Sequence, residues 1–165
     1  MNKVYFKPTS EFVDLANKVF EEQKKKILEF IPNALVEHIG STAIFGSFTK
    51  GDLDINVRVK GKDFNKAIKA LRETYQINQP ENWTEDFASF KSKTENIDFG
   101  IQLVIKGSNS DDFVLLRDVL INHPALLKEY NKMKSNNEGK EMDKYQREKA
   151  DFFQKLREKF ALGRE

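Results

Sequence analysis

One segment of this chain, residues 52–59, alternates polar and apolar residues without interruption. Its apolar positions are Leu53, Ile55, Val57 and Val59. Its polar positions are Asp52, Asp54, Asn56 and Arg58. A period of two is that of a β-strand, in which successive side chains point to opposite faces of a sheet. The segment therefore predicts a strand that buries one face and presents Asp52 and Asp54 together on the other.

Three more segments carry strand signals. Residues 34–39 form a short strand candidate, and residues 87–92 and 97–106 are joined by a polar turn, as in a β-hairpin. In the last of these segments the apolar residues again alternate strictly, at Ile97, Phe99, Ile101, Leu103 and Ile105. Together the segments predict a small sheet with one apolar and one polar face.

Apolar residues at helical spacing surround these strands. They predict an amphipathic helix over residues 10–31, which ends before Pro32, and a second helix from Phe64 to Leu71 with Asp63 as its cap. Three further helices are predicted over residues 111–122, 124–134 and 140–162, and Pro124 suits the first turn of its helix.

The order of these elements predicts an α+β fold, with a small mixed β-sheet, an N-terminal helix packed against it and a C-terminal helical portion that closes a cleft. The chain has 165 residues, enough for one substantial core, and no segment has the composition of a domain-boundary linker. We therefore expect a single domain over residues 1–165.

The composition restricts the chemistry. The chain has no cysteine and only two histidines, far apart in sequence, so a metal ion would be held by oxygen ligands, which Mg²⁺ prefers. No apolar run approaches the roughly 18 residues of a membrane span. The first residues lack the apolar stretch of a signal peptide. We expect a cytoplasmic protein with no membrane partner.

Charge bears on the class of ligand. The 28 basic and 26 acidic residues are mixed along the chain and leave a formal net charge of +2. This balance gives no strong footprint for long nucleic acid, whose binding depends on clustered cations. A small ligand is the expected partner.

Asp52 and Asp54 are the first candidates for catalytic residues. Two carboxylates on one face of a strand can share divalent ions, which neutralise a triphosphate and orient its leaving group. Asp98 begins the strand through Ile105 on the face opposite the apolar series, and we predict it as the third metal ligand and the catalytic base.

The residues Gly40-Ser41-Thr42 follow a strand and are candidates for a phosphate-binding turn, because glycine permits close approach and backbone N–H groups bind phosphate oxygens. The acidic pair alone is weak support, since 11 aspartates in 165 residues give roughly 0.7 Asp-x-Asp pairs by chance. A plain surface strand is the alternative. The second Gly-Ser, at Gly46-Ser47, lies too close to Asp52 and is assigned to a turn.

A Gly-Ser followed after eleven residues by Asp-apolar-Asp-apolar resembles the signature of the DNA polymerase beta type nucleotidyltransferase superfamily. The run from His38 to Ala43, His-Ile-Gly-Ser-Thr-Ala, is similar to the hallmark of its GrpB branch. C-terminal pieces agree in order and spacing, at Leu116-Arg117-Asp118-Val119-Leu120, His123-Pro124, Tyr130 with Met133-Lys134, and Tyr145 with Lys149 and Phe152.

This resemblance implies a nucleotidyltransferase-like fold in a bacterial-type protein, with Asp52, Asp54 and Asp98 around Mg²⁺ or Mn²⁺. It further implies a bound nucleoside triphosphate and transfer of a nucleoside monophosphate to an unknown acceptor. Two departures stand out. Many members have an apolar residue where Asp52 stands, and Phe45 replaces the usual proline of the loop.

Four cationic or imidazole side chains remain to be assigned. Lys134 and Lys149 occupy family-matched positions, and a lysine on a core-facing helix stripe has to snorkel or meet an anion such as phosphate, so both are predicted to bind nucleotide. His38 shares a strand face with Val36, which favours a supporting hydrogen bond over proton transfer. His123 is explained by its helix junction.

Two other functions stay open at this stage. The first is a non-catalytic nucleotide or phosphometabolite binding module of the same fold, since fold alone does not settle activity. The second is a protein-interaction domain that uses the C-terminal helices, which a large exposed apolar patch would favour.

Overall fold

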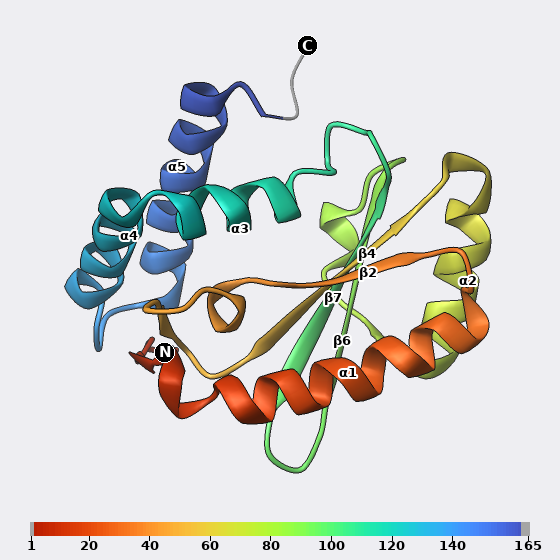
Figure 1. The fold of residues 1–165 in the computed structure, drawn as a ribbon, viewed down its shortest axis with the longest axis horizontal. Coiled ribbons are helices and arrows are strands. Elements are labelled where there is room, and N and C mark those ends of the chain that lie inside the picture. The colour runs from red at the N-terminus through yellow and green to blue at the C-terminus, as the bar shows by residue number, and fades with distance from the viewer. Residues whose placement is uncertain (1, 163–165) are drawn as a thin grey trace.

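The computed structural model describes residues 2–162 and centres on a five-stranded mixed sheet (Figure 1). The strands lie in the order β2 (Leu35–Ile39), β4 (Leu53–Val59), β7 (Asp98–Ile105), β6 (Phe87–Lys93) and β5 (Gln76–Ile77). β4 and β7 run parallel at the centre, and the other neighbours are antiparallel. The predicted α+β fold and its four strands are confirmed. The short edge strand β5 was not predicted.

One face of the sheet forms the main core. In register across three strands, Ile55 pairs with Ile101, and Ile101 pairs with Phe90. All three side chains are fully buried. These rows follow directly from the alternation in the sequence, because every second side chain of a strand faces the same side.

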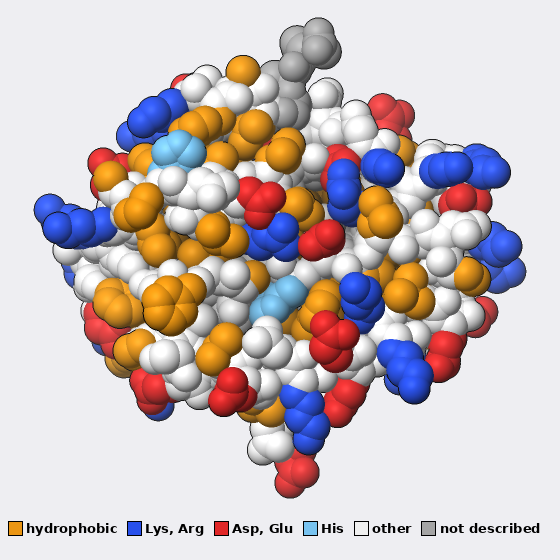
Figure 2. Space-filling model, viewed as in Figure 1, with side chains coloured by type: hydrophobic (Ala, Val, Ile, Leu, Met, Phe, Trp, Pro, Cys, Tyr) orange, Lys and Arg blue, Asp and Glu red, His pale blue; other side chains and the backbone are white. Residues whose placement is uncertain are grey.

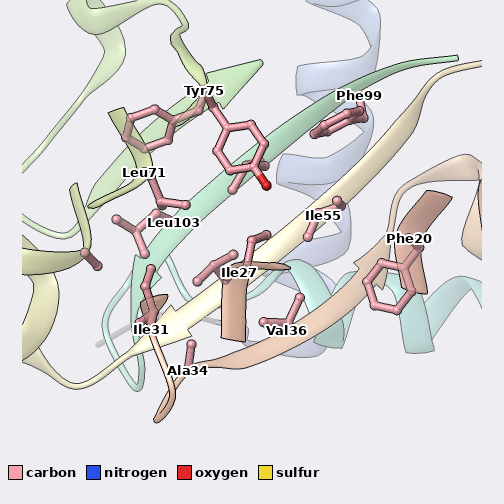
Figure 3. Packing of buried hydrophobic residues seen from close by; sticks show 14 of the residues in the cluster. Phe20, Ile27, Ile31, Ala34, Val36, Ile55, Leu71, Tyr75, Phe99 and Leu103 are labelled. Atoms are coloured by element: carbon pink, nitrogen blue, oxygen red, sulfur yellow. The ribbon is translucent and has the colours of Figure 1, made fainter. Parts of the chain in front are cut away.

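Two helices cover this apolar face, α1 (Val13–Phe30) and α2 (Phe64–Thr74) (Figure 1). Figure 3 shows Ile27 of α1 beside Val36 and Ile55 of the sheet, with Leu71 and Leu103 nearby. Asp63 is the N-cap residue of α2, as predicted, but it does not cap the helix through its side chain. It also belongs to the preceding 3₁₀ turn, η3 (Gly61–Asp63).

Three helices lie toward the other face, α3 (Phe113–Asn122), α4 (Pro124–Asn136) and α5 (Met142–Phe160) (Figure 1). They enclose a second core whose buried members are Ile44, Leu116, Leu120, Tyr130 and Leu156. Ile44 belongs to the loop after β2, so this loop is anchored in the helical portion rather than in the main core.

A second, two-stranded sheet was also not predicted. It pairs β1 (Lys7–Pro8) with β3 (Phe48–Thr49). Each strand has two residues, too few to show a period of two. The N-terminal segment is also tied to the connection between α4 and α5, because the Val4 N–H donates to the Lys140 carbonyl and the Gly139 N–H to the Val4 carbonyl. The remaining 3₁₀ turns are η1 (Thr9–Glu11), η2 (Ser41–Ala43) and η4 (Pro80–Asn82).

Two arginine–aspartate pairs hold the helical portion against the sheet. The Arg58 side chain of β4 donates two hydrogen bonds to Asp111, at 2.7 and 2.8 Å. Arg157 of α5 donates to the neighbouring Asp112 at 2.6 Å. Both carboxylates are almost fully buried. Helix α3 begins at Phe113, two residues after the predicted Asp111, because the backbone of Asp112 is not helical, with a φ of −123°.

His38 lies on the α1 side of the sheet. Its ring stacks on Phe20 with centroids 5.2 Å apart, and its Nε2 is 2.9 Å from Thr42 Oγ1. The pKa of His38 is lowered to about 4, mainly by burial and to a smaller extent by the charge of Arg117. The ring is therefore neutral and structural at physiological pH, as the sequence favoured.

Within residues 2–162, no helix combines the length and hydrophobicity needed to cross a bilayer.

Replacing Ile101 by alanine tests the central row. The substitution removes a fully buried side chain between Ile55 and Phe90, and we expect it to lower the free energy of unfolding by about 2–5 kcal/mol. Urea denaturation measures this loss. Leu35→Ala, at a strand position that is 43% exposed, is the control, and its expected loss is below about 1 kcal/mol. Equal losses would contradict the assignment of this face as the core.

The lowered pKa of His38 predicts a pH dependence of stability. Between pH 6.5 and about 4, the unfolded chain binds a proton at His38 that the folded protein excludes, so stability falls as the pH falls through this window. Above pH 6.5 this contribution is constant. We expect the melting temperature of His38→Gln to decrease less than that of the wild type between pH 6.5 and 4.5. Parallel melting curves for the two proteins would contradict the shift.

Candidate active site

The acidic pair lies where β4 meets the helical portion. Asp54 is the second residue of β4 and is partly buried, whereas Asp52 precedes the strand with its side chain 40% exposed. Because the two residues are two apart, their side chains share the face opposite the main core. Lys50 Nζ lies 3.9 Å from Asp52 Oδ2. The structure therefore brings these two predicted residues together.

Two glycines enclose the Asp54 carboxylate. Gly40 has a φ of +75°, and a Cβ added there would overlap Asp54 Oδ2. Gly100 pairs with Asp54 in register, and a Cβ at that position would lie 3.6 Å from Oδ1. We call this arrangement the glycine slot. It explains the glycine of the Gly-Ser turn: its backbone takes a left-handed conformation and leaves room for the carboxylate.

The environment of Asp54 shifts the pKa of its carboxyl group. Burial, and next the charge of Asp52, raise the pKa of Asp54 to about 6, although the nearby lysines Lys149, Lys50 and Lys134 oppose this shift. A carboxylate whose ionisation is disfavoured by a neighbouring Asp52 suits a divalent cation, which would relieve the repulsion, and the hard oxygen donors of the pair match Mg²⁺. The donor set therefore fits the implied metal.

Asp98 is placed less favourably. It begins β7 with an exposed side chain, pairs in register with Lys93 of β6, and lines the same hollow as Asp52 and Asp54. Over residues 2–162, no three Asp, Glu or His side chains form a cluster that is ready to hold a metal ion. The role of Asp98 as third ligand and base stays a prediction.

The Gly-Ser turn is a 3₁₀ turn, η2, rather than the start of a helix. Its shape is held by hydroxyl groups from elsewhere in the chain. Ser47 Oγ donates to the Ser41 carbonyl at 2.6 Å, and Thr9 Oγ1 donates to it at 3.2 Å. Thr42, predicted to bind nucleotide, is buried, and its hydroxyl faces His38. The second Gly-Ser, set aside as a turn, thus supports the first.

Lys134 occupies the interior behind the turn. Its side chain is 1% exposed, and its Nζ donates to Ser41 Oγ at 2.5 Å and to the Phe48 carbonyl at 2.6 Å. The amine also lies 3.9 Å from the centre of the Tyr130 ring. Burial, with a smaller contribution from Lys149, lowers the pKa of Lys134 to about 6. These contacts make Lys134 a positioning residue for Ser41.

Lys149 of α5 has the more open position. It lines a cavity together with Asp54, is partly buried, and forms no salt bridge within residues 2–162. Burial acts to lower the pKa of Lys149, but Tyr145 and the two acidic residues outweigh it and raise the pKa above the usual value. The side chain therefore stays charged, close to the acidic pair.

Two hollows meet at Asp54 and Gln102. The less open of the two, which we call the enclosed cavity, has a volume of about 180 Å³ and lies between the sheet and the helices. Its other lining residues are Ile39, Gly40, Ser41, Ile44, Phe113, Leu116, Arg117, Leu120, Tyr130, Lys149, Phe153 and Arg157. The open groove, about 680 Å³, crosses the uncovered part of the sheet past Asp52, Asp98, Lys91 and Lys93. A carboxylate between two hollows is an arrangement suited to two substrates.

Gln102 was missed by sequence reasoning. Its Oε1, and Oδ1 of the register partner Asn56, are buried without a hydrogen-bond partner among the described residues. The alternation of the strand could have identified Gln102 as a site residue, since it falls on the same face as Asp98 and Gly100. Gln102 lines both hollows, so its unpaired acceptor can receive a hydrogen bond from a ligand.

Two other conspicuous residues have structural contacts. Arg117 of α3 donates to Glu37 at 3.0 Å and to the His38 carbonyl at 2.9 Å, which ties α3 to β2. His123 Nδ1 is 2.8 Å from the Val119 carbonyl, and its ring packs edge-on against Phe160. His123 therefore closes the junction between α3 and α4.

The surface agrees with the mixed charge of the sequence. Figure 2 shows cationic and anionic side chains interspersed over one face, with hydrophobic side chains gathered over the α3 and α4 side. Large apolar residues at least 43% exposed are Tyr5, Leu35, Phe45, Leu115 and Ile121. Phe45, which is 94% exposed, is one of the two residues that depart from the pattern described above.

Two sequence comparisons find relatives of this chain. The family model described as GrpB protein matches residues 13–159. A UPF0157 protein of Vibrio cholerae serotype O1 is 29% identical over 157 residues, which cover 94% of this chain and 82% of that protein.

Two solved structures are similar in fold. The conserved protein GrpB from Enterococcus faecalis has a TM-score of 0.60 and 19% identity, with 73% of this chain and 76% of that chain covered. The Cid1 poly(U) polymerase with MgGTP bound has a TM-score of 0.50 and 14% identity, with 74% of this chain but only 41% of the polymerase covered. The fold is thus nucleotidyltransferase-like, and because the family model spans most of its length, this chain belongs to the GrpB family.

Proposed function

We propose that this protein is a Mg²⁺-dependent nucleotidyltransferase that moves a nucleoside monophosphate from a nucleoside triphosphate to an acceptor hydroxyl. The observation that carries the proposal is the Asp54 carboxylate, held in the glycine slot beside Asp52, in a cavity that it lines together with the charged Lys149. Acidic ligands and a nearby lysine are the groups that triphosphate chemistry requires.

Asp52 and Asp54 would hold Mg²⁺, or Mn²⁺, which supplies charge neutralisation to the triphosphate when it is bound. The chain's own residues do the rest. Gly40 and Ser41 line the enclosed cavity together with Lys149, so we place the phosphate oxygens between this turn and the ammonium group. Lys134 keeps the Ser41 turn in place from behind.

The enclosed cavity is suited to only part of the nucleotide. Its volume of about 180 Å³ is smaller than a typical ligand site, which occupies about 300–1,000 Å³. Aromatic side chains of Phe113 and Phe153 line it, and Gln102 contributes an unpaired amide oxygen. We place the phosphates here, between the Gly40-Ser41 turn and Lys149, with the α-phosphate beside Asp54.

In the transfer step, the acceptor hydroxyl gives its proton to Asp98, and the acceptor oxygen attacks the α-phosphorus. A new oxygen–phosphorus bond forms as the bond to the bridging oxygen breaks, and pyrophosphate leaves with Lys149 beside its charge. Asp98 is the base because it lies in the open groove, on the side away from the donor cavity. The similar fold of the poly(U) polymerase described with MgGTP bound supports this class of donor.

A non-catalytic module that binds a nucleotide or phosphometabolite is the second candidate. The observation in its favour is the position of Asp98, which is exposed and does not join Asp52 and Asp54 in a three-carboxylate cluster among the described residues. In that case donor binding persists while no transfer follows.

Neutralising the acidic pair separates the two candidates. We expect Asp52→Asn and Asp54→Asn each to reduce transfer from a labelled triphosphate by at least about 100-fold, because the metal loses a charged ligand. Calorimetry with Mg²⁺ and each nucleoside triphosphate measures binding in parallel. Asp14→Asn, an exposed aspartate on α1, is the control and should leave both values unchanged. Unaltered binding in both variants, together with no turnover in the wild type, would exclude the enzyme.

Substitution of Gly40 tests the glycine slot. Gly40→Ala adds a Cβ that overlaps Asp54 Oδ2, so we expect the variant to displace the carboxylate and to bind MgATP at least about tenfold more weakly. Gly107→Ala is a matched control, because Gly107 also has a positive φ but no atom within 4 Å of an added Cβ. Both variants place alanine at a positive φ, so equal nucleotide affinity in the two would contradict the role of the slot.

A further inference from the structure

The open groove continues beyond the acidic residues to the edge of the sheet. Two lysines of β6, Lys91 and Lys93, line its far side, and Thr74, Gln76 and Asn78 close it along the α2–β5 edge. The proposed function places the donor on the other side of Asp54 and gives this groove no occupant except an undefined acceptor.

The strand register fixes how the lysines lie relative to the acidic residues. Gly100 of β7 pairs with Asp54 on one side and with Lys91 on the other. Neighbouring strands are about 4.8 Å apart, so the backbones of Asp54 and Lys91 are separated by about 10 Å. In the next row on this face, Lys93 pairs with Asp98. Two cations thus face three carboxylates across the groove.

Gly100 leaves the sheet surface between Asp54 and Lys91 without a side chain. As a glycine it places no side chain between Asp54 and Lys91, and an added Cβ would lie 3.3 Å from the Gln102 amide nitrogen. A small molecule that lies across the strands therefore meets backbone at this point instead of a side chain.

The lysines are available to a ligand. Lys91 and Lys93 are exposed, and within residues 2–162 neither forms a salt bridge, although Lys93 lies opposite Asp98 in register. Because they are two residues apart on one strand, both ammonium groups rise from the same face. Paired cations in this geometry suit a phosphate group, which accepts several charge-assisted hydrogen bonds.

We propose that the acceptor is a small hydroxyl compound that carries a phosphate group, with its phosphate on Lys91 and Lys93 and its hydroxyl beside Asp98. This inference rests on the proposed function and defines its acceptor. The hydroxyl oxygen attacks the α-phosphorus, its proton passes to Asp98, and pyrophosphate leaves, so the product is a phosphodiester between the nucleoside monophosphate and the phosphorylated compound. Two lysines in a chain of mixed charge give no track for a long polyanion.

Binding of phosphate probes to the full chain tests the proposal. In amide-resolved NMR titrations, inorganic phosphate and ribose 5-phosphate should shift Lys91 and Lys93 saturably, and ribose should not. The double variant Lys91→Gln/Lys93→Gln should bind both phosphate probes at least about tenfold more weakly. Lys60→Gln/Lys62→Gln removes two exposed lysines at the same spacing outside the groove and should bind like the wild type.

The outcomes separate this inference from the function on which it rests. Unchanged phosphate binding in Lys91→Gln/Lys93→Gln overturns the inference, as does a wild type in which phosphate leaves both lysines unshifted. Tighter binding of a short oligouridylate than of ribose 5-phosphate overturns the small acceptor. MgATP affinity is measured on the same variants and should not change. Absence of MgATP binding to the wild type counts against the proposed function alone.

Discussion

The structure depends on one constraint. A carboxylate that can still ionise has to be held on one face of the central sheet, while the opposite face of that sheet packs into a hydrophobic core. β4 meets this constraint by strict alternation, which sends Ile55 into the core and Asp54 to the other face. Burial of Asp54 raises its pKa, and three nearby lysines oppose this rise. The glycine slot is the steric counterpart of this electrostatic arrangement.

The helical portion is organised around the same point. Ile44, from the loop that carries the Gly-Ser turn, packs in the second core, and Lys134 bonds that turn from below. The N-terminal residue Thr9 and the loop residue Ser47 bond its carbonyl. The turn is thus held by its own loop and by two distant parts of the chain, the N-terminal segment and α4, which makes its shape a property of the whole fold. Rigid support of this kind is what a phosphate-binding turn requires.

The enclosed cavity and the open groove have different linings, which distinguishes the two sides of the site. The enclosed cavity has aromatic walls and Lys149, whereas the open groove has polar walls and a pair of lysines. Their shared residues, Asp54 and Gln102, mark the boundary between the donor and acceptor sides that we propose. The protein-interaction alternative gains little from the surface, because most apolar residues of α3 to α5 are packed in the second core. Phe45 is exposed, and nothing in the structure explains its replacement of proline.

Local pattern in the sequence was enough to determine the strands β2, β4, β6 and β7, the five helices, and the common face of Asp52 and Asp54, because periodicity depends only on residues near in the chain. The two-residue strands carry no period and were missed. Only the tertiary structure decided that Lys134 supports Ser41 from the interior, that Thr42 turns toward His38, and that Gly100 and Gln102 border Asp54. These contacts join residues 4 to 93 positions apart, and the cost of burying each polar group is set by partners that no local pattern records.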